Sequence, residues 1–252
     1  MKIDRLAMAV LATLAAASVA AAPIIVSTNF RTDVYGASAT SGVAPGNYLH
    51  LDTTVTSPDI PADVSAVATY SLDSTVVRTL DFYTGPIFAG KNFDRLLSDT
   101  TQTSAWNLAA TDSSGTSNGV FAAIAAPEFL PLVMNLHVIG NGTRPTIAWD
   151  LPDLSGFDVD RIRVRATNAA TGVQIFQSGN LSPTSTSFLM PGGILLLGNG
   201  YEFRVILDDT ETGRLENRSN TFSGVVVIPE PGSVALLGLG LAALAAARRR
   251  KQ

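Results

Sequence analysis

The chain has 252 residues, no cysteine, two histidines and a formal net charge of −4. The lack of cysteine excludes disulfides, thiolate catalysis and cysteine-ligated zinc, and two histidines leave little room for imidazole chemistry. The body between Pro23 and Ile228 holds 11 basic and 19 acidic residues, and this excess of acid argues against nucleic-acid binding, which needs clustered Lys and Arg.

The N-terminus predicts export. A charged start precedes an apolar run that ends at about Val19, and small residues follow it. This order of charged, apolar and small-residue segments is that of a secretory signal peptide. We therefore expect residues 1–21 to be a signal peptide. Cleavage after Ala20 or Ala21 is favoured, because a cut after Ala22 would leave Pro23 directly behind the scissile bond.

Residues 24–130 are expected to form a β-sandwich domain. Short β-branched and aromatic runs alternate there with Gly, Pro, Asn, Asp and Ser clusters, a pattern typical of sandwich folds. A helical turn is expected within 89–99, a turn or hairpin connection at 112–119, and a domain boundary at the prolines of 125–131. The expected strands are 48–55, 64–70, 76–83 and 106–111.

Residues 131–226 predict a second β-sandwich with seven strands. Between residues 161 and 167, arginines alternate with Ile162, Val164 and Ala166, which indicates one wet face and one buried face. The expected strands are 132–138, 146–149, 161–167, 173–177, 187–190, 201–207 and 216–222. The position of Trp149 in the second strand and of Tyr201 at the start of the sixth resembles a fibronectin type III domain, where a tyrosine corner belongs at that point. The chain is thus expected to be all-β, with two immunoglobulin- or fibronectin III-like sandwiches.

Seven carboxylates are expected to crowd one end of the second sandwich. Four precede its third strand and three follow its sixth, and these two loops meet at the same end of an immunoglobulin-like fold. Oxygen ligands at this density suit Ca²⁺. The alternative is a set of solvated acidic loops, since the spacing of an EF-hand is absent. The candidate calcium ligands are Asp150, Asp153, Asp158, Asp160, Asp208, Asp209 and Glu211.

Neither the histidines nor the aromatic residues form a recognisable catalytic or sugar-binding motif. His50 and His137 alternate with apolar neighbours and are expected at surface or rim positions. Four aromatic residues of the first half could stack on sugar rings, although core packing explains most such residues. They are Tyr83, Phe88, Phe93 and Trp106. No other cofactor is indicated, and we expect no enzymatic activity.

The C-terminal 26 residues predict a short membrane anchor at the end of the chain. Residues 233–247 are apolar, and at 1.5 Å per residue they span roughly 22 Å, which is short of a hydrocarbon core of about 30 Å. Prolines precede this segment and arginines follow it, so a transmembrane helix is expected to begin near 233 and end before Arg248. The arginine cluster would remain on the cytoplasmic side, with the body outside.

The tail resembles the PEP-CTERM sorting signal of Gram-negative bacteria over 227–252. The resemblance is carried by the tripeptide Pro229-Glu230-Pro231, the apolar segment, and the basic cluster of Arg248, Arg249 and Arg250. It implies processing by exosortase, a protease of the inner membrane, at a site near the tripeptide. It also implies a transient inner-membrane intermediate and delivery to the cell surface or the extracellular matrix.

Three functions are compatible with these features. The first is a structural or adhesive surface protein that acts by contact with exopolysaccharide or other surface proteins. The second is a carbohydrate-binding module that engages exopolysaccharide. The third is a secreted hydrolase, which would need a catalytic carboxylate pair or triad that the sequence does not display. The first function is favoured, and no nucleic-acid partner is expected.

Overall fold

The computed structural model describes residues 22–83, 90–140, 142–211 and 214–230. Within these ranges the chain is almost entirely β-structure, apart from one short 3-10 helix. The predicted all-β class is therefore confirmed. The expected signal peptide at 1–21 and the expected transmembrane helix at 233–247 lie outside the described residues.

The strands form three sheets within the described residues. The largest has eight strands in the order β12-β11-β14-β15-β1-β2-β6-β5, and the smaller ones have the orders β13-β10-β9 and β4-β3-β7-β8. The bounds are β1 (Ile24–Tyr35), β2 (Gly46–Thr56), η1 (Pro61–Asp63), β3 (Ser65–Tyr70), β4 (Val77–Thr79), β5 (Asp81–Tyr83), β6 (Lys91–Leu97), β7 (Trp106–Asp112), β8 (Gly115–Phe121), β9 (Met134–Ile139), β10 (Thr146–Asp150), β11 (Val159–Asn168), β12 (Gln174–Gln177), β13 (Ser187–Leu189), β14 (Gly200–Glu211) and β15 (Arg214–Val227).

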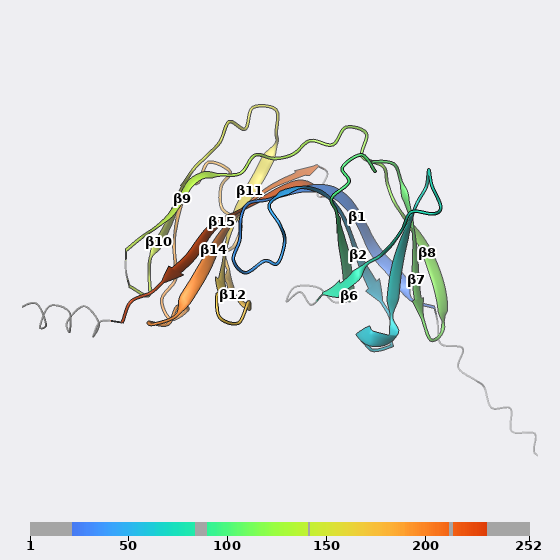
Figure 1. Ribbon diagram of the computed structural model, residues 1–252, viewed down its shortest axis with the longest axis horizontal. Helices are drawn as coiled ribbons and strands as arrows, with labels where there is room; N and C mark the ends of the chain where they lie inside the picture. Colours follow the sequence, from blue (N-terminus) through green and yellow to red (C-terminus); the bar gives the residue numbers. More distant parts are fainter. Residues whose placement is uncertain (1–21, 84–89, 141, 212–213, 231–252) are drawn as a thin grey trace, which may run out of the picture.

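The eight-stranded sheet is shared by both halves of the chain. β1 pairs in parallel with β15, with Thr32 opposite Asn217 and Tyr35 opposite Asn220. Figure 1 shows this sheet bent into an arch, with β9 and β10 outside one arm and β7 and β8 outside the other. We call the concave side of the shared sheet the inner face, and the side that carries the smaller sheets the outer face.

Two apolar cores lie between the outer face and the smaller sheets. One contains Leu51 and Trp106, and the other contains Trp149 and Phe203, all of them at most 2% exposed. Burial of a large apolar side chain contributes about 1.5–3 kcal/mol. The cores hold each sandwich together, and the parallel pairing of β1 with β15 joins the two sandwiches.

The alternation predicted for residues 161–167 is confirmed. Ile162, Val164 and Ala166 of β11 are fully buried in the second core, while the arginines between them lie on the inner face. Successive side chains of a strand point to opposite faces of its sheet. The apolar residues therefore fix which side of β11 faces the core.

The two predicted landmarks of the second sandwich are present. Trp149 is 2% exposed and lies in the core. Tyr201 is also buried, and its hydroxyl accepts a hydrogen bond of 2.9 Å from the backbone N–H of Leu196. This contact to a residue shortly upstream is the geometry of a tyrosine corner.

Of two local predictions in the first half, one is wrong and one is confirmed. Residues 90–99, the described part of the segment 89–99, contain strand β6 and no helical turn. Its buried residues Phe93 and Leu97 are four apart, a spacing that fits one face of a helix or of a strand. In the segment 112–119, the expected hairpin connection is present as a tight turn between Asp112 and Gly115, although β8 occupies the rest of the segment.

Strand β1 was not among the predicted strands. Its second half has polar residues such as Arg31 and Asp33 where apolar ones would mark a buried strand, yet both are at most 2% exposed. Their burial comes from partners on neighbouring strands, which local sequence does not reveal. In the described part of the chain, no helix is long and apolar enough to cross a membrane.

Candidate functional site

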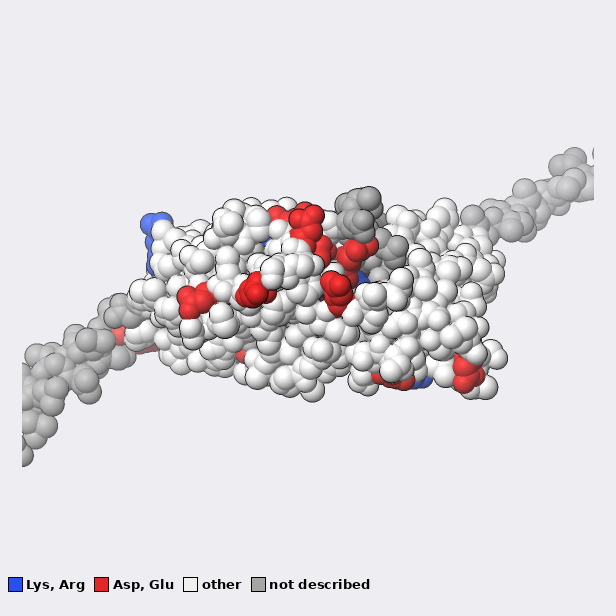
Figure 2. All heavy atoms as spheres, turned by 90° about the horizontal axis from the view of Figure 1, so that it is seen from above, with Lys and Arg blue, Asp and Glu red and all other residues white. Residues whose placement is uncertain are grey.

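The inner face of the shared sheet carries a band of arginines. The register of the central strands places Arg165 opposite Arg204, and Asp208 opposite both Arg161 and Arg218. The arginines of the band, with their strands, are Arg161, Arg163 and Arg165 (β11), Arg204 (β14), Arg218 (β15) and Arg31 (β1). Most of the clustered positive charge of this acidic body therefore lies on one surface. Figure 2, which views the opposite side of the molecule, shows acidic side chains gathered over its middle with few basic ones.

Asp208 is the anionic centre for three of these arginines. Its carboxylate is fully buried and accepts hydrogen bonds from Arg161 Nε at 2.9 Å, Arg218 Nε at 2.7 Å and Arg163 Nη2 at 2.5 Å. Burial alone would raise the pKa of Asp208, but the positive charges of Arg218 and Arg163 outweigh it and lower the pKa to about 2. The cluster ties β11, β14 and β15 together.

A second buried ionic cluster lies beside it on β1 and β2. Arg31 Nε donates to Asp33 Oδ1 at 3.1 Å, and Arg31 Nη1 donates to Asp52 Oδ2 at 2.9 Å. His50 Nδ1 lies 2.6 Å from Asp33 Oδ2, and its Nε2 forms an ion pair of 3.1 Å with Asp94 Oδ2. Burial opposes the charge on Asp33, but Arg31 and His50 lower its pKa well below the usual range.

His50 corrects the expectation of a surface or rim position. The residue is 5% exposed. Burial and Arg31 both lower the pKa of His50, but Asp33 and the hydrogen bonds of Asp33 and Asp94 outweigh them, so the net shift is upward. His137 is exposed as predicted. One signal in the sequence could have revealed the cluster. Ionisable residues occupy alternate positions on two neighbouring strands, with Arg31 and Asp33 on β1 and His50 and Asp52 on β2.

The acidic groups of these two clusters are bound to partners and do not present free carboxylates. Asp208 is held by arginines, and Asp33 is held by Arg31 and His50. Asp52 also accepts a hydrogen bond of 3.0 Å from the Tyr83 hydroxyl. Chemically, the clusters hold charged side chains in fixed positions where the two halves of the molecule meet.

A pocket of about 260 Å³ opens on the inner face next to these clusters. The guanidinium carbon of Arg204 lies 6.0 Å from the ring centroid of Tyr35 and 5.6 Å from that of Phe222. Arg165 lines the same pocket and donates from Nε to Gln177 Oε1 at 2.7 Å. Neither arginine forms an ion pair within the described residues.

The loop between β1 and β2 forms one wall of this pocket through Thr40, Ser41 and Val43. Figure 1 shows the loop in blue beneath the arch, close to β12. Glu202 fixes the loop, since its carboxylate accepts hydrogen bonds from the Ser38 hydroxyl at 2.7 Å and from the backbone N–H groups of Ala39 at 2.7 Å and Thr40 at 3.1 Å.

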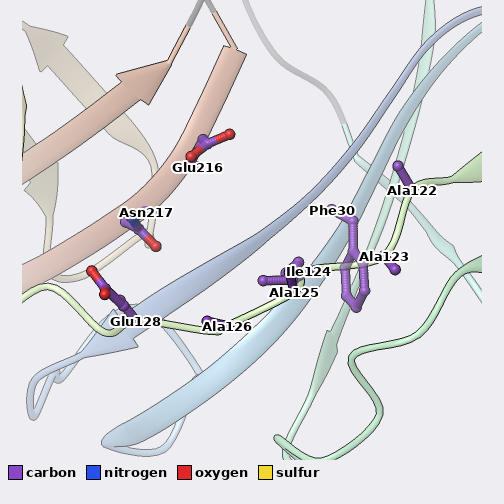
Figure 3. A pocket seen from close by; sticks show the side chains of 9 residues that line it. All are labelled: Phe30, Ala122, Ala123, Ile124, Ala125, Ala126, Glu128, Glu216 and Asn217. Carbon is purple, nitrogen blue, oxygen red and sulfur yellow. The ribbon is translucent and has the colours of Figure 1, made fainter.

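A second cavity, of about 340 Å³, lies where the segment after β8 passes β1 and β15. Figure 3 shows its lining, which is mainly the backbone and methyl groups of 122–126 with Phe30 beneath and Glu128, Glu216 and Asn217 at one side. The polar side chains of this cavity lie at one side, while its alanines offer no hydrogen bonds or ionic contacts.

The structure does not bring the seven predicted calcium ligands together. Asp208 lies on the inner face and is bound by three arginines, which corrects its placement in an acidic loop. Asp150 accepts a hydrogen bond from Asn135, and Asp153 accepts one from the backbone N–H of Ser155. The side chain of Glu211 is outside the described part.

The remaining three predicted ligands lie close to one another. Burial, Asp160 and Asp158 raise the pKa of Asp209, while Asn217 donates to its carboxylate at 3.0 Å. Asp160 is engaged by the backbone N–H of Thr210 at 2.6 Å. Among the described residues there is no group of three or more His, Asp or Glu side chains arranged to hold a metal ion.

The aromatic residues considered for sugar stacking are mostly core residues. Phe93 and Trp106 are buried at 2% and 0% exposure. Tyr83 is half-buried and bonded to Asp52, and Phe88 is not described. The aromatic rings that lie beside the arginine pocket, Tyr35 and Phe222, were not considered from the sequence.

The folded body ends immediately before the tail. Ile228 is 1% exposed in the second core, its carbonyl accepts a hydrogen bond of 2.6 Å from the N–H of Gly198, and its N–H donates to the carbonyl of Asn199 at 3.0 Å. Pro229 and Glu230 follow and are described. The other predicted residues of the sorting signal, Pro231, Arg248, Arg249 and Arg250, are not.

The comparisons with known proteins concern the tail and, loosely, the body. A crystal structure of a run of titin domains is similar with a TM-score of 0.31 and 12% identity, over 79% of this chain and 62% of that one, which is less than two thirds of its length. A crystal structure of chicken CNTN1 FN1-FN3 domains gives a TM-score of 0.31 and 12% identity over 84% of this chain and 67% of that one.

Overlays this loose carry no argument, and the sandwich architecture rests on the sheets and cores described above. Among curated proteins, none matches the sequence. The model of the PEP-CTERM protein-sorting motif matches residues 227–251. The chain therefore carries a PEP-CTERM protein-sorting motif whose match begins at the end of β15, one residue before Ile228, the last buried residue in the described part of the chain.

Proposed function

We propose that the protein is an exported structural or adhesive component of the cell surface or the extracellular matrix, sorted through its PEP-CTERM tail. The observation that carries this proposal is the position of the motif. Residues 227–251 match the sorting model, and Ile228 is the last buried residue of the body among those that the structure describes. Cleavage by exosortase near the tripeptide would separate the tail without opening either core.

The proposed route has three stages. The signal peptide at 1–21 directs export, the tail holds an intermediate in the inner membrane with its arginines inside, and exosortase then releases the body to the surface or the matrix. The body supports a structural role because its two sandwiches share one sheet, are joined by the parallel pairing of β1 with β15, and each carry a buried charge cluster beside that junction. The proposal requires no catalytic residue, and we propose that the protein is not an enzyme.

Fractionation of the producing cells tests this proposal. In a host with exosortase, the protein is expected in the surface and matrix fractions. In a host without exosortase, it is expected to accumulate in the inner membrane. Equal distribution of the protein in the two hosts would contradict sorting through the tail, and a hydrolytic activity of the purified body would contradict a structural role.

The second candidate function is a carbohydrate-binding protein that engages exopolysaccharide. The observation that favours it is the pocket that combines Arg165 and Arg204 with the rings of Tyr35 and Phe222. A pull-down of the purified protein with the polymer of its own host distinguishes the two candidates. Retention on the polymer that free polymer reverses is expected only for the carbohydrate-binding function.

A further inference from the structure

The arginine pocket of the inner face contains two arginines, Arg165 and Arg204, that form no direct ion pair with a described carboxylate. The side chain of Arg204 has neither a hydrogen bond nor an ion pair to any described residue, and its Nε is buried without a partner. Arg165 bonds only to the amide of Gln177, which is neutral. A buried donor left unpaired costs about 1–3 kcal/mol, and more when the group is charged. The two residues are therefore poised to receive an anionic group.

The electrostatic surroundings of Arg165 and Arg204 also favour the binding of an anion. Burial and the positive charges of Arg204, Arg218 and Arg163 lower the pKa of Arg165 to about 9. Burial lowers the pKa of Arg204 to about 10, with Arg218 and Arg163 acting in the same direction and Tyr35 and Asp33 opposing them. Both side chains are thus still protonated at neutral pH. The nearby carboxylate of Asp208 is already engaged by three other arginines, and that of Glu202 by the loop at 38–40.

The rest of the lining matches a small hydroxylated ligand. The pocket of about 260 Å³ adds side-chain hydroxyls from Thr40, Ser41 and Thr167 and an amide from Gln174. Tyr35 and Phe222, stacked at 6.4 Å between centroids and 21° between planes, supply an apolar wall. Hydroxyl and amide groups hydrogen-bond to sugar hydroxyls, and an aromatic face packs against the C–H groups of a sugar ring.

We propose that this pocket binds a sugar acid, with its carboxylate on Arg165 and Arg204 and its ring against Tyr35 and Phe222. A guanidinium matches a carboxylate with two parallel hydrogen bonds, which fixes the orientation of the bound ring. This site deepens the second candidate function by naming its ligand class. It does not depend on sorting, because binding can be measured on the isolated protein whether or not exosortase cleaves the tail.

The test is a titration of the ¹⁵N-labelled exported protein with D-glucuronate, followed through the Nε–Hε resonances of its arginines. The Nε–H of Arg204, which lacks a partner, is expected to shift saturably, with a dissociation constant on the order of millimolar for one small ring. D-glucose, which lacks the carboxylate, is expected to leave it unshifted. Sulfate and acetate, which lack the ring, are expected to bind at least tenfold more weakly than glucuronate.

Variants then assign the site. Arg204→Gln and Arg165→Gln are each expected to weaken glucuronate binding at least tenfold. Arg144→Gln, which removes the same charge from an exposed loop, is expected to leave it unchanged. Because the titration of the unsubstituted protein does not depend on the folding of any variant, absence of a saturable shift overturns the proposal. Equal binding of sulfate and glucuronate, or equal loss in the Arg144→Gln variant, overturns it as well.

Discussion

At the scale of single residues, the inner face shows how an acidic body keeps arginines partly buried. Asp208 holds Arg161, Arg163 and Arg218 within 2.9 Å, and Asp33 holds Arg31 and His50. Paired buried charges of this kind fix which side chains meet, although their net stabilisation is modest. Removing one partner is strongly destabilising, because the charged side chains that remain are then buried without a counter-charge.

Replacing Asp208 is expected to be severely destabilising. In Asp208→Asn, three guanidinium groups lose their common counter-charge, and the loss expected for breaking a buried ion pair is about 3–5 kcal/mol in the free energy of unfolding. Urea denaturation measures it. Asp153→Asn removes a carboxylate of the same type from an exposed loop and is expected to change the stability by less than about 1 kcal/mol. Similar values for the two variants would contradict the clustered role of Asp208.

The buried histidine predicts a pH dependence of stability. The pKa of His50 is raised above its ordinary value of 6.5, so the folded state holds the proton more tightly than the unfolded state. The stabilisation is complete below about pH 6.5 and is lost as the pH rises through the pKa of the folded state, at up to about 1.4 kcal/mol per pH unit. Unfolding titrations between pH 6 and 9 measure this slope.

Replacing each histidine in turn shows which of the two causes the pH dependence. His50→Gln is expected to flatten the pH dependence, while His137→Gln, in which the exposed histidine is replaced, is expected to retain it. At the acidic end, Asp208 has a lowered pKa, so its contribution is present above its ordinary pKa near 4 and is lost as the pH falls toward about 2. A stability that rises steadily from pH 6 to 9 would contradict the role assigned to His50.

At the scale of elements, the loop between β1 and β2 depends on one carboxylate. Glu202 of β14 binds the Ser38 hydroxyl and the backbone N–H groups of Ala39 and Thr40. Hydrogen bonds to a charged acceptor contribute about 1.5–3 kcal/mol each. In Glu202→Gln, hydrogen exchange of these two amides is expected to accelerate at least tenfold. Glu128→Gln, which changes an exposed glutamate, is expected to leave the exchange rates of these amides unchanged. Equal rates in the two variants would contradict the role assigned to Glu202.

Local sequence predicted the second sandwich better than the first. Between residues 161 and 167 of β11, Ile162, Val164 and Ala166 alternate with arginines and are fully buried, so the pattern matched the structure. β1 failed because its inner-face residues, Arg31 and Asp33, are buried by ionic partners on other strands instead of by apolar packing. β6 failed because two apolar residues four positions apart fit either a helix or a strand.

The candidate sites, too, could be predicted only where their residues are contiguous in the sequence. The sorting tail could be predicted because its signal is contiguous, and the matched residues 227–251 agree with the prediction. The arginine pocket could not, because Tyr35, Arg165, Arg204 and Phe222 come from four strands whose register is set by the sheet. The predicted acidic cluster assumed that Asp208 belongs to a loop, whereas β14 continues through it to Glu211.

At the scale of the whole molecule, the shared sheet predicts that both sandwiches unfold together. The chain has two tryptophans, and the structure places Trp106 in one core and Trp149 in the other. In Trp106→Phe and Trp149→Phe, the remaining tryptophan reports on one core, while far-ultraviolet circular dichroism reports on all strands. The two signals are expected to have the same urea midpoint within each variant. Two separate circular-dichroism transitions, only one of them followed by the tryptophan, would show independent sandwiches.

The central claim is that a folded all-β body is exported and then separated from a sorting tail that begins where its core ends. Its most direct test is the intact mass of the mature protein from hosts with and without exosortase. With exosortase, we expect a new C-terminus near Pro229, Glu230 and Pro231 and an N-terminus after Ala20 or Ala21. Without exosortase, we expect the same N-terminus and an untrimmed Gln252. A protein that keeps both original ends in the host with exosortase would contradict the account.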